Sequence, residues 1–105
     1  MPQPKKPTEH EIQTDIMDWL DAKGYFFWRN NSGAVKRGKR YIRFGAKGSP
    51  DIFVIRNGKI WGIEVKDHRG KLSGEQAEFL TAMQDNGGGY IIARSLEEVT
   101  LVLES

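Results

Sequence analysis

The pair Asn57-Gly58 constrains the fold of this chain more than any other feature of the sequence. It separates two apolar runs, residues 51–56 and 59–66, and an Asn-Gly pair between such runs is typical of a β-hairpin with a two-residue turn. A two-residue turn fixes the register, because each residue before the turn then pairs with one residue after it. The sequence therefore predicts a hairpin in which Asp51 lies directly opposite Glu64.

This register brings two carboxylates together at the open end of the hairpin. Strand alternation places Asp51, Glu64 and Lys66 on one side of the sheet and Val65 on the other. Like charges directly opposite each other destabilise a sheet, so the repulsion has to be offset. The residues leave three explanations open: a divalent cation such as Mg²⁺ or Mn²⁺, an ion pair with Lys66, or strand ends that splay into solvent. With a metal, Lys66 could orient a water molecule or stabilise charge on a phosphate.

The remaining sequence predicts a single domain over residues 8–105, preceded by a flexible basic tail over residues 1–7. Capping boxes begin two helices, one at Thr8 and one at Ser73. Further predicted elements are strands over 25–29 and 90–93, a basic hairpin or loop over 35–44, and a last helix with Val99, Val102 and Leu103 inward. The expected fold is α/β, a mixed central sheet flanked by helices in the order αβ(β)ββαβα.

Composition excludes several other classes of protein. The chain has no cysteine, which rules out a disulfide scaffold and a thiolate metal site. Its apolar runs are too short to span a bilayer, and its N-terminus lacks the apolar core of a signal peptide. We therefore expect a soluble, cytoplasmic protein.

Positive charge is concentrated in one segment of the chain. No acidic residue occurs from Ala22 to Pro50, although this segment holds eight of the sixteen lysines and arginines. Aromatic residues are interleaved with these cations, and that combination is typical of surfaces that bind phosphates and stack on bases. The alternative is a solvated basic hairpin without a partner.

Several motifs together resemble a known nuclease family. Gly48-Ser49-Pro50-Asp51, followed after twelve residues by Glu64-Val65-Lys66, resembles the PD-(D/E)XK motif. Three flanking motifs are similar to the VRR-NUC family in its compact stand-alone form: Thr8-Glu9-x-x-Ile12-Gln13, Asn31-Ser32-Gly33 and Leu72-Ser73-x-x-Gln76. The resemblance covers nearly the whole chain from Thr8 onward.

The resemblance implies a restriction-endonuclease-like fold and Mg²⁺- or Mn²⁺-dependent cleavage of DNA phosphodiester bonds. It also implies a homodimer that acts on branched DNA, as Holliday-junction resolvases do. Asp51 and Glu64 would hold the metal, with the Val65 backbone carbonyl and Glu9 as further candidates. Lys66 would attend the attacking water, and Gln76 would line the site. The residues expected to contact DNA are Arg29, Asn31, Ser32, Lys36, Arg37, Lys39, Arg40, Arg43 and Lys47.

Two of these roles have competing assignments. Glu11 completes the capping box at Thr8, whereas Glu9 shares a helix face with the inward-pointing Ile16, so we favour Glu9 as the site carboxylate. Gln76 could equally be explained by its own capping box, in which it reaches back to the Ser73 amide.

Other functions and two dimer surfaces also stay open at this point. The chain could be a non-catalytic DNA-binding module that uses the basic segment 22–50. A sequence-specific restriction enzyme is disfavoured, because only residues 35–44 could supply base readout. A dimer could form through the exposed face of the first helix with Trp19, or through the aromatic run Tyr25–Trp28.

Overall fold

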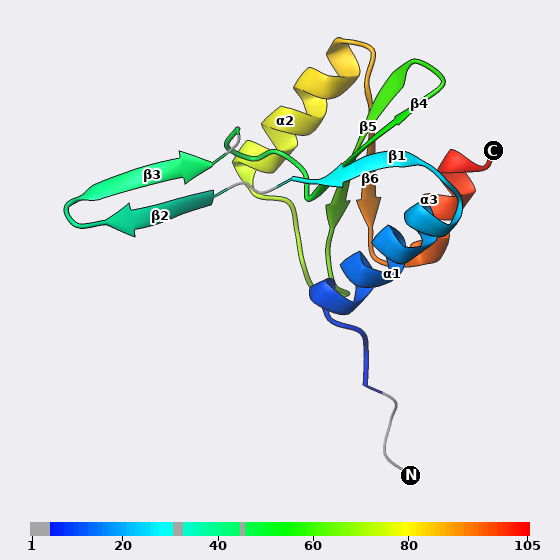
Figure 1. The fold of residues 1–105 in the computed structure, drawn as a ribbon, viewed down its shortest axis with the longest axis horizontal. Coiled ribbons are helices and arrows are strands. Elements are labelled where there is room, and N and C mark those ends of the chain that lie inside the picture. The colour runs from blue at the N-terminus through cyan, green and yellow to red at the C-terminus, as the bar shows by residue number, and fades with distance from the viewer. Residues whose placement is uncertain (1–4, 31–32, 45) are drawn as a thin grey trace.

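A computed structural model shows a four-stranded sheet with helices on both faces and a separate two-stranded arm (Figure 1). It describes residues 5–30, 33–44 and 46–105, with the backbone alone for 33–37 and 40–44. In chain order the elements are α1 (Glu9–Ala22), β1 (Phe26–Arg29), β2 (Gly33–Arg37), β3 (Arg40–Phe44), β4 (Ile52–Arg56), β5 (Lys59–Val65), α2 (Gly74–Asp85), β6 (Gly89–Ala93) and α3 (Leu96–Leu103).

The main sheet is mixed, as predicted. Its strand order is β1-β4-β5-β6; the pairs β1-β4 and β4-β5 are antiparallel, and β6 runs parallel to β5. The predicted basic hairpin is confirmed as the arm, in which β2 pairs only with β3. Figure 1 shows the arm projecting from the body, well away from α1 and α3.

The hairpin of β4 and β5 has the predicted register. Arg56 pairs with Lys59, and Ile52 pairs with Ile63 at the other end. Asn57 and Gly58 both have positive φ, 52° and 77°, which is the backbone that a type I′ turn requires. Asn57 and Gly58 therefore form the predicted turn, and this turn sets the register that brings Asp51 and Glu64 together.

One face of the sheet holds the core, under α1 and α3. Each helix contributes apolar residues at a spacing of about one turn, so that they form one inward stripe. The buried residues are Ile12, Ile16, Leu20, Ile52, Val54, Ile63, Val65, Ile91, Ala93, Val99 and Leu103. The prediction that Val102 points inward is wrong: it is 37% exposed, because the inward stripe of α3 passes through Val99 and Leu103.

The other face is only partly covered, by α2. Phe79 of α2 lies over Phe53 with ring centroids 6.4 Å apart. Four apolar side chains on this face stay open to solvent: Phe26 (68% exposed), Trp28 (40%), Ile55 (41%) and its partner Ile60 (38%). We call Phe26, Trp28 and Ile55 the aromatic surface.

Two expectations concern the chain outside this body. Of the basic tail predicted over residues 1–7, residues 1–4 lie outside the described part, and residues 5–7 are exposed and precede the first helix. Among the described residues, no helix is long and apolar enough to cross a membrane.

Candidate active site

The loop that carries Asp51 is fixed from two sides. Asn30, at the end of β1, donates from Nδ2 to Ser49 Oγ (2.7 Å) and to the Pro50 carbonyl (2.9 Å). On the other side, Gly48 has φ +79°, and a Cβ there would clash with the Glu75 carbonyl of α2. The loop is therefore packed between β1 and α2, and Asp51 follows directly.

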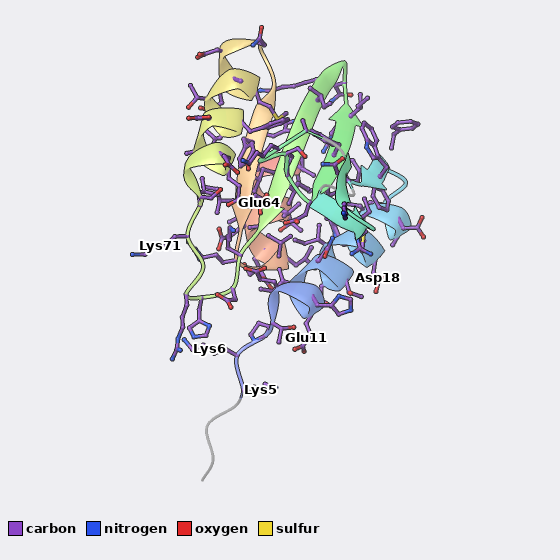
Figure 2. The ribbon with its side chains drawn as sticks, turned by 90° about the vertical axis from the view of Figure 1, so that its left-hand side faces the viewer. Lys5, Lys6, Glu11, Asp18, Glu64 and Lys71 are labelled. Carbon is purple, nitrogen blue, oxygen red and sulfur yellow. The ribbon has the colours of Figure 1, made fainter. Side chains whose placement is uncertain are left out.

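Asp51 and Glu64 meet at the end of the sheet. Asp51 Oδ2 accepts a hydrogen bond from the Val65 backbone amide at 2.8 Å, next to Glu64. Glu64 is 3% exposed and lies beside the first turn of α2 (Figure 2). Burial and the neighbouring Asp51 carboxylate raise the pKa of Glu64 to about 8, even though the Lys66 charge acts to lower it.

Gln76 takes both of the roles that the sequence left open. Its Oε1 accepts from the Ser73 amide at 2.9 Å, which completes the capping box of α2. Its Nε2 donates to Glu64 Oε1 at 3.0 Å. One side chain therefore begins the helix and orients the buried carboxylate, because the two ends of its amide have opposite hydrogen-bonding character.

Lys66 forms an ion pair with the same oxygen of Glu64. Its Nζ lies 3.7 Å from Glu64 Oε1, and its side chain is 12% exposed. The other carboxylate oxygen, Oε2, is buried and has no hydrogen-bond partner within the described residues. Gln76 and Lys66 thus satisfy only one side of the carboxylate.

These contacts separate the three explanations for the acidic pair. The strand ends do not splay into solvent, because Glu64 is buried and Asp51 is bonded to the Val65 amide. Lys66 does pair with Glu64, but burial and then the Asp51 charge still raise the pKa of Glu64, so this ion pair does not outweigh the two together. A hard divalent cation fits what is left: two carboxylates and one unpaired, buried oxygen.

Glu9 and Glu11 have different surroundings in the structure. Glu11 completes the capping box, and hydrogen bonds from Thr8 lower the pKa of its carboxyl. Glu9 turns toward the site: a Cβ on Gly70 would lie 3.2 Å from Glu9 Oε1 and 3.0 Å from Lys66 Cδ. The Glu9 charge also acts on Glu64, where it is the smallest of the causes that raise the pKa. In residues 5–30, 33–44 and 46–105, no group of three acidic or histidine side chains is close enough together to hold a metal.

The basic segment is distributed over the arm and its base. Arg29 is exposed at the end of β1 and Lys39 is exposed in the turn of the arm. Lys47 forms an ion pair with Glu75 at 2.8 Å. Asn31 and Ser32 lie outside the described residues. The other cations predicted to contact DNA lie on the two strands of the arm: Lys36, Arg37, Arg40 and Arg43.

Sequence reasoning missed two residues that shape the site, Asn30 and Tyr90. The position of Asn30 after an aromatic strand indicates only a turn, because its partners Ser49 and Pro50 are distant in sequence. Tyr90, on β6, has a buried hydroxyl without a hydrogen-bond partner in the described part of the chain. The parallel register of β5 and β6 places it near the site, and no local pattern in the sequence fixes that register.

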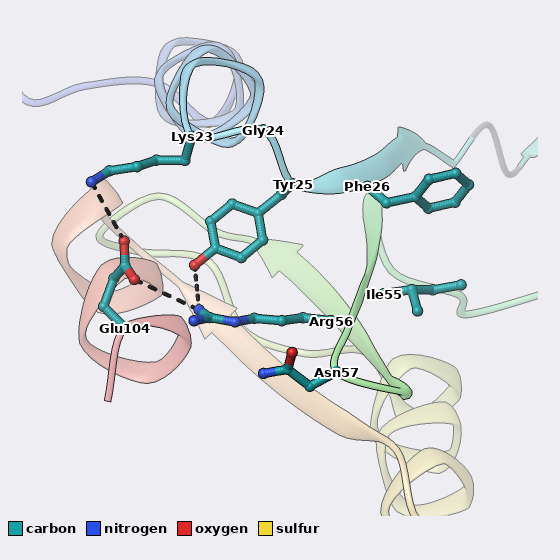
Figure 3. A pocket seen from close by; sticks show the side chains of 8 residues that line it. All are labelled: Lys23, Gly24, Tyr25, Phe26, Ile55, Arg56, Asn57 and Glu104. Carbon is teal, nitrogen blue, oxygen red and sulfur yellow. Dashed lines mark hydrogen bonds and ion pairs between the residues drawn. The ribbon is translucent and has the colours of Figure 1, made fainter.

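A second pocket lies at the opposite end of the hairpin, at its turn (Figure 3), and its charged side chains pair with one another. Its central Arg56 donates to the Tyr25 hydroxyl and to the Leu103 carbonyl, and lies 3.6 Å from Glu104 Oε2. Lys23 pairs with the same glutamate at 3.7 Å. Because its charges are paired with one another, this cluster ties α3 to the hairpin turn.

Comparison with known proteins supports the fold. Neither a family model nor a curated protein sequence matches this chain. A solved structure described as a VRR_NUC domain matches with a TM-score of 0.65 and 22% sequence identity, over 93% of this chain and 97% of that chain. The chain has the fold of a VRR_NUC domain.

Proposed function

We propose that this protein is a metal-dependent endonuclease that hydrolyses phosphodiester bonds in DNA. The observation that carries the proposal is the half-buried Asp51 next to the buried Glu64 and Lys66, in the fold of a VRR_NUC domain. Carboxylates and a lysine at one edge of a sheet supply what phosphodiester hydrolysis needs: metal ligands and a positive charge near the reacting phosphate.

Each residue of the site has a separate proposed role. Asp51 and Glu64 would hold Mg²⁺ or Mn²⁺, with the Val65 carbonyl as a backbone ligand and Glu9 as an outer carboxylate. A bound ion of this kind eases deprotonation of water and offsets charge on a phosphate. Lys66 orients the attacking water and stabilises the negative charge that develops. Gln76 holds the Glu64 carboxylate in one orientation through its hydrogen bond.

The basic arm is proposed to hold the DNA backbone. The arm begins beside Asp51, because Asn30 binds the loop that carries this aspartate. Phosphates that contact the arm therefore continue toward the acidic pair. Arg29 and Lys39 are exposed for such contacts, and Asn31, Ser32 and Lys47 belong to the same proposed surface.

The proposed substrate is branched DNA, cut by a homodimer. Each chain has one acidic pair, whereas symmetric cleavage of a four-way junction needs two sites in fixed register. The aromatic surface supports dimerisation, because it joins an edge strand to exposed apolar side chains. Trp19 is less suited to a dimer surface, since it packs on Tyr25 with ring centroids 5.4 Å apart and contacts the core.

Cleavage assays test the nuclease proposal. With Mg²⁺ or Mn²⁺ and labelled duplex, flap or four-way-junction DNA, Asp51→Asn and Lys66→Met should each lower the cleavage rate by about 100-fold or more. Asp18→Asn and Lys59→Met are the matched controls, because both residues are exposed and Lys59 lies at the hairpin turn, at the other end of β5 from Glu64. DNA binding without cleavage under either metal would instead indicate a binding module. Equal rates in the site variants and the wild type would contradict the proposal.

Light scattering tests the dimer separately. The wild-type protein should be a dimer at micromolar concentration, and Phe26→Asp should convert it to a monomer. Leu101→Asp is the matched control, because Leu101 is also apolar and 73% exposed but lies on α3. A wild-type monomer that nicks one strand would contradict the dimer and leave the nuclease intact.

A further inference from the structure

The hydroxyl of Tyr90 is an unusual group to find at this position. It is buried and forms no hydrogen bond within the described residues. A buried donor without a partner costs free energy, and a phenylalanine would fill the same space without that cost. We therefore expect a hydrogen-bond acceptor that the hydroxyl could reach when the protein binds a ligand.

Strand register places this hydroxyl on the same side of the sheet as Glu64. In the parallel pair of β5 and β6, Tyr90 lies opposite Gly62, and Ile92 lies opposite Glu64. Because side chains alternate along a strand, Tyr90 and Glu64 both face α2. Gly62 has no side chain to separate them, and Pro50 and Met83 close the space above it. The phenol hydroxyl is thus buried on the side of the sheet that α2 covers.

The electrostatics of the two groups agree with this placement. Burial raises the pKa of the Tyr90 hydroxyl above its usual range, and the charges of Glu64 and Asp51 raise it further. The phenol therefore lies within electrostatic reach of both carboxylates and keeps its proton. It is a donor, and the Oε2 of Glu64, which has no partner within the described residues, is an acceptor in the charged form that a metal requires.

We propose that Tyr90 is a positioning residue of the metal site, whose hydroxyl donates to the Oε2 side of the Glu64 carboxylate, directly or through one water. Gln76 and Lys66 already hold Oε1. A donor on the second oxygen would fix the orientation of the whole carboxylate. Partners of this kind, behind the ligands themselves, set the affinity of a site for its metal. The inference rests on the proposed function, because it requires that Glu64 binds a metal.

The test is metal binding by the full chain without DNA. Titration calorimetry with Mn²⁺ should show that Tyr90→Phe binds about tenfold more weakly than the wild type. Thermal unfolding in EDTA should show that the same variant is as stable as the wild type or more so, because it loses a hydroxyl without a partner. Tyr25→Phe is the matched control: it removes the same atom at the opposite end of the hairpin, where Arg56 binds it, and should leave Mn²⁺ affinity unchanged.

Two outcomes would overturn this inference while leaving the proposed function intact. Wild-type Mn²⁺ affinity in Tyr90→Phe would show that the hydroxyl does not act on Glu64. Marked destabilisation of Tyr90→Phe in EDTA would show that the hydroxyl has a structural role in the metal-free fold. Failure of the wild type itself to bind Mn²⁺ is a different result, which would overturn the proposed function and the inference together.

Discussion

At the scale of single residues, Glu64 is where the fold and the proposed chemistry conflict. A buried carboxylate beside a second acid costs free energy. The fold imposes this position on Glu64: because Val65 points into the core, the next side chain along the strand, Glu64, faces α2 and Asp51. The charged form is supported by Lys66 and Gln76 on one oxygen only. Without a metal, the fold therefore disfavours the charged form of Glu64, which is the form that binds a metal.

This conflict predicts a pH dependence of stability. The pKa of Glu64 is about 8 in the folded protein and near 4.5 for an ordinary glutamate. Between these values the folded state binds a proton that the unfolded state has released, so the free energy of unfolding should fall as pH rises from about 4.5 to about 8. In EDTA, Glu64→Gln should remove this fall, which is on the order of 1 kcal/mol or more.

Thermal unfolding across this pH range measures the effect. Glu78→Gln is the matched control, because Glu78 is exposed on α2 and should keep the wild-type slope. Identical slopes in Glu64→Gln and the wild type would contradict the prediction. Saturating Mn²⁺ should flatten the wild-type slope, because the metal favours the charged carboxylate.

At the scale of elements, the sequence predicted features that depend on neighbouring residues better than features that depend on long-range packing. The two capping boxes and the Asn57-Gly58 turn give the correct helix starts and hairpin register, because each depends on residues a few positions apart. The acidic pair follows from that register. The position of β6 beside β5 does not, and neither does the contact of Gly48 with α2, because both depend on residues that meet only after folding.

The contact between Gly48 and α2 carries a prediction of its own. Gly48→Ala should destabilise the protein by about 2 kcal/mol, because alanine at φ +79° is strained and its Cβ would clash with the Glu75 carbonyl. The displaced loop should also weaken metal binding through Asp51. Gly74→Ala is the control: it has no atom within 4 Å of its added Cβ and lies in the first turn of α2.

Chemical denaturation and Mn²⁺ titration measure both consequences for the two variants. Gly74→Ala should match the wild type or gain up to about 1 kcal/mol, because alanine favours helix more than glycine does. Equal stability of Gly48→Ala and Gly74→Ala would mean that the loop tolerates a side chain and is not fixed by α2.

At the scale of the whole molecule, the protein divides its proposed tasks between a body and an arm (Figure 1). The body contains the core and the acidic pair, while the arm is a sheet of its own with five cations. The net charge of +2 hides this division, because it sums a basic arm and a body that carries the acidic residues. Charge placement therefore indicates more about the partner than the total does.

Replacing residues 33–44 with a short Gly-Ser linker tests the division. The shortened protein should keep its thermal stability and Mn²⁺ affinity, because the arm pairs only with itself. Its DNA affinity should fall by about tenfold or more, and the dependence of affinity on salt should become less steep by about 0.9 for each lost phosphate contact. Fluorescence anisotropy at several salt concentrations measures both. Wild-type affinity and salt dependence would place the DNA surface on the body instead.

The bonds from Asn30 to Ser49 and Pro50 hold the two ends of the arm together at its base. A cut in the turn between Gly38 and Lys39 would therefore leave one fragment with α1 and β1 and another with the acidic pair. Both fragments contribute to the same core, so the nicked protein should stay assembled. The turn is thus a natural place to split the protein into two complementing halves, one supplying Glu9 and the other supplying Asp51, Glu64 and Lys66.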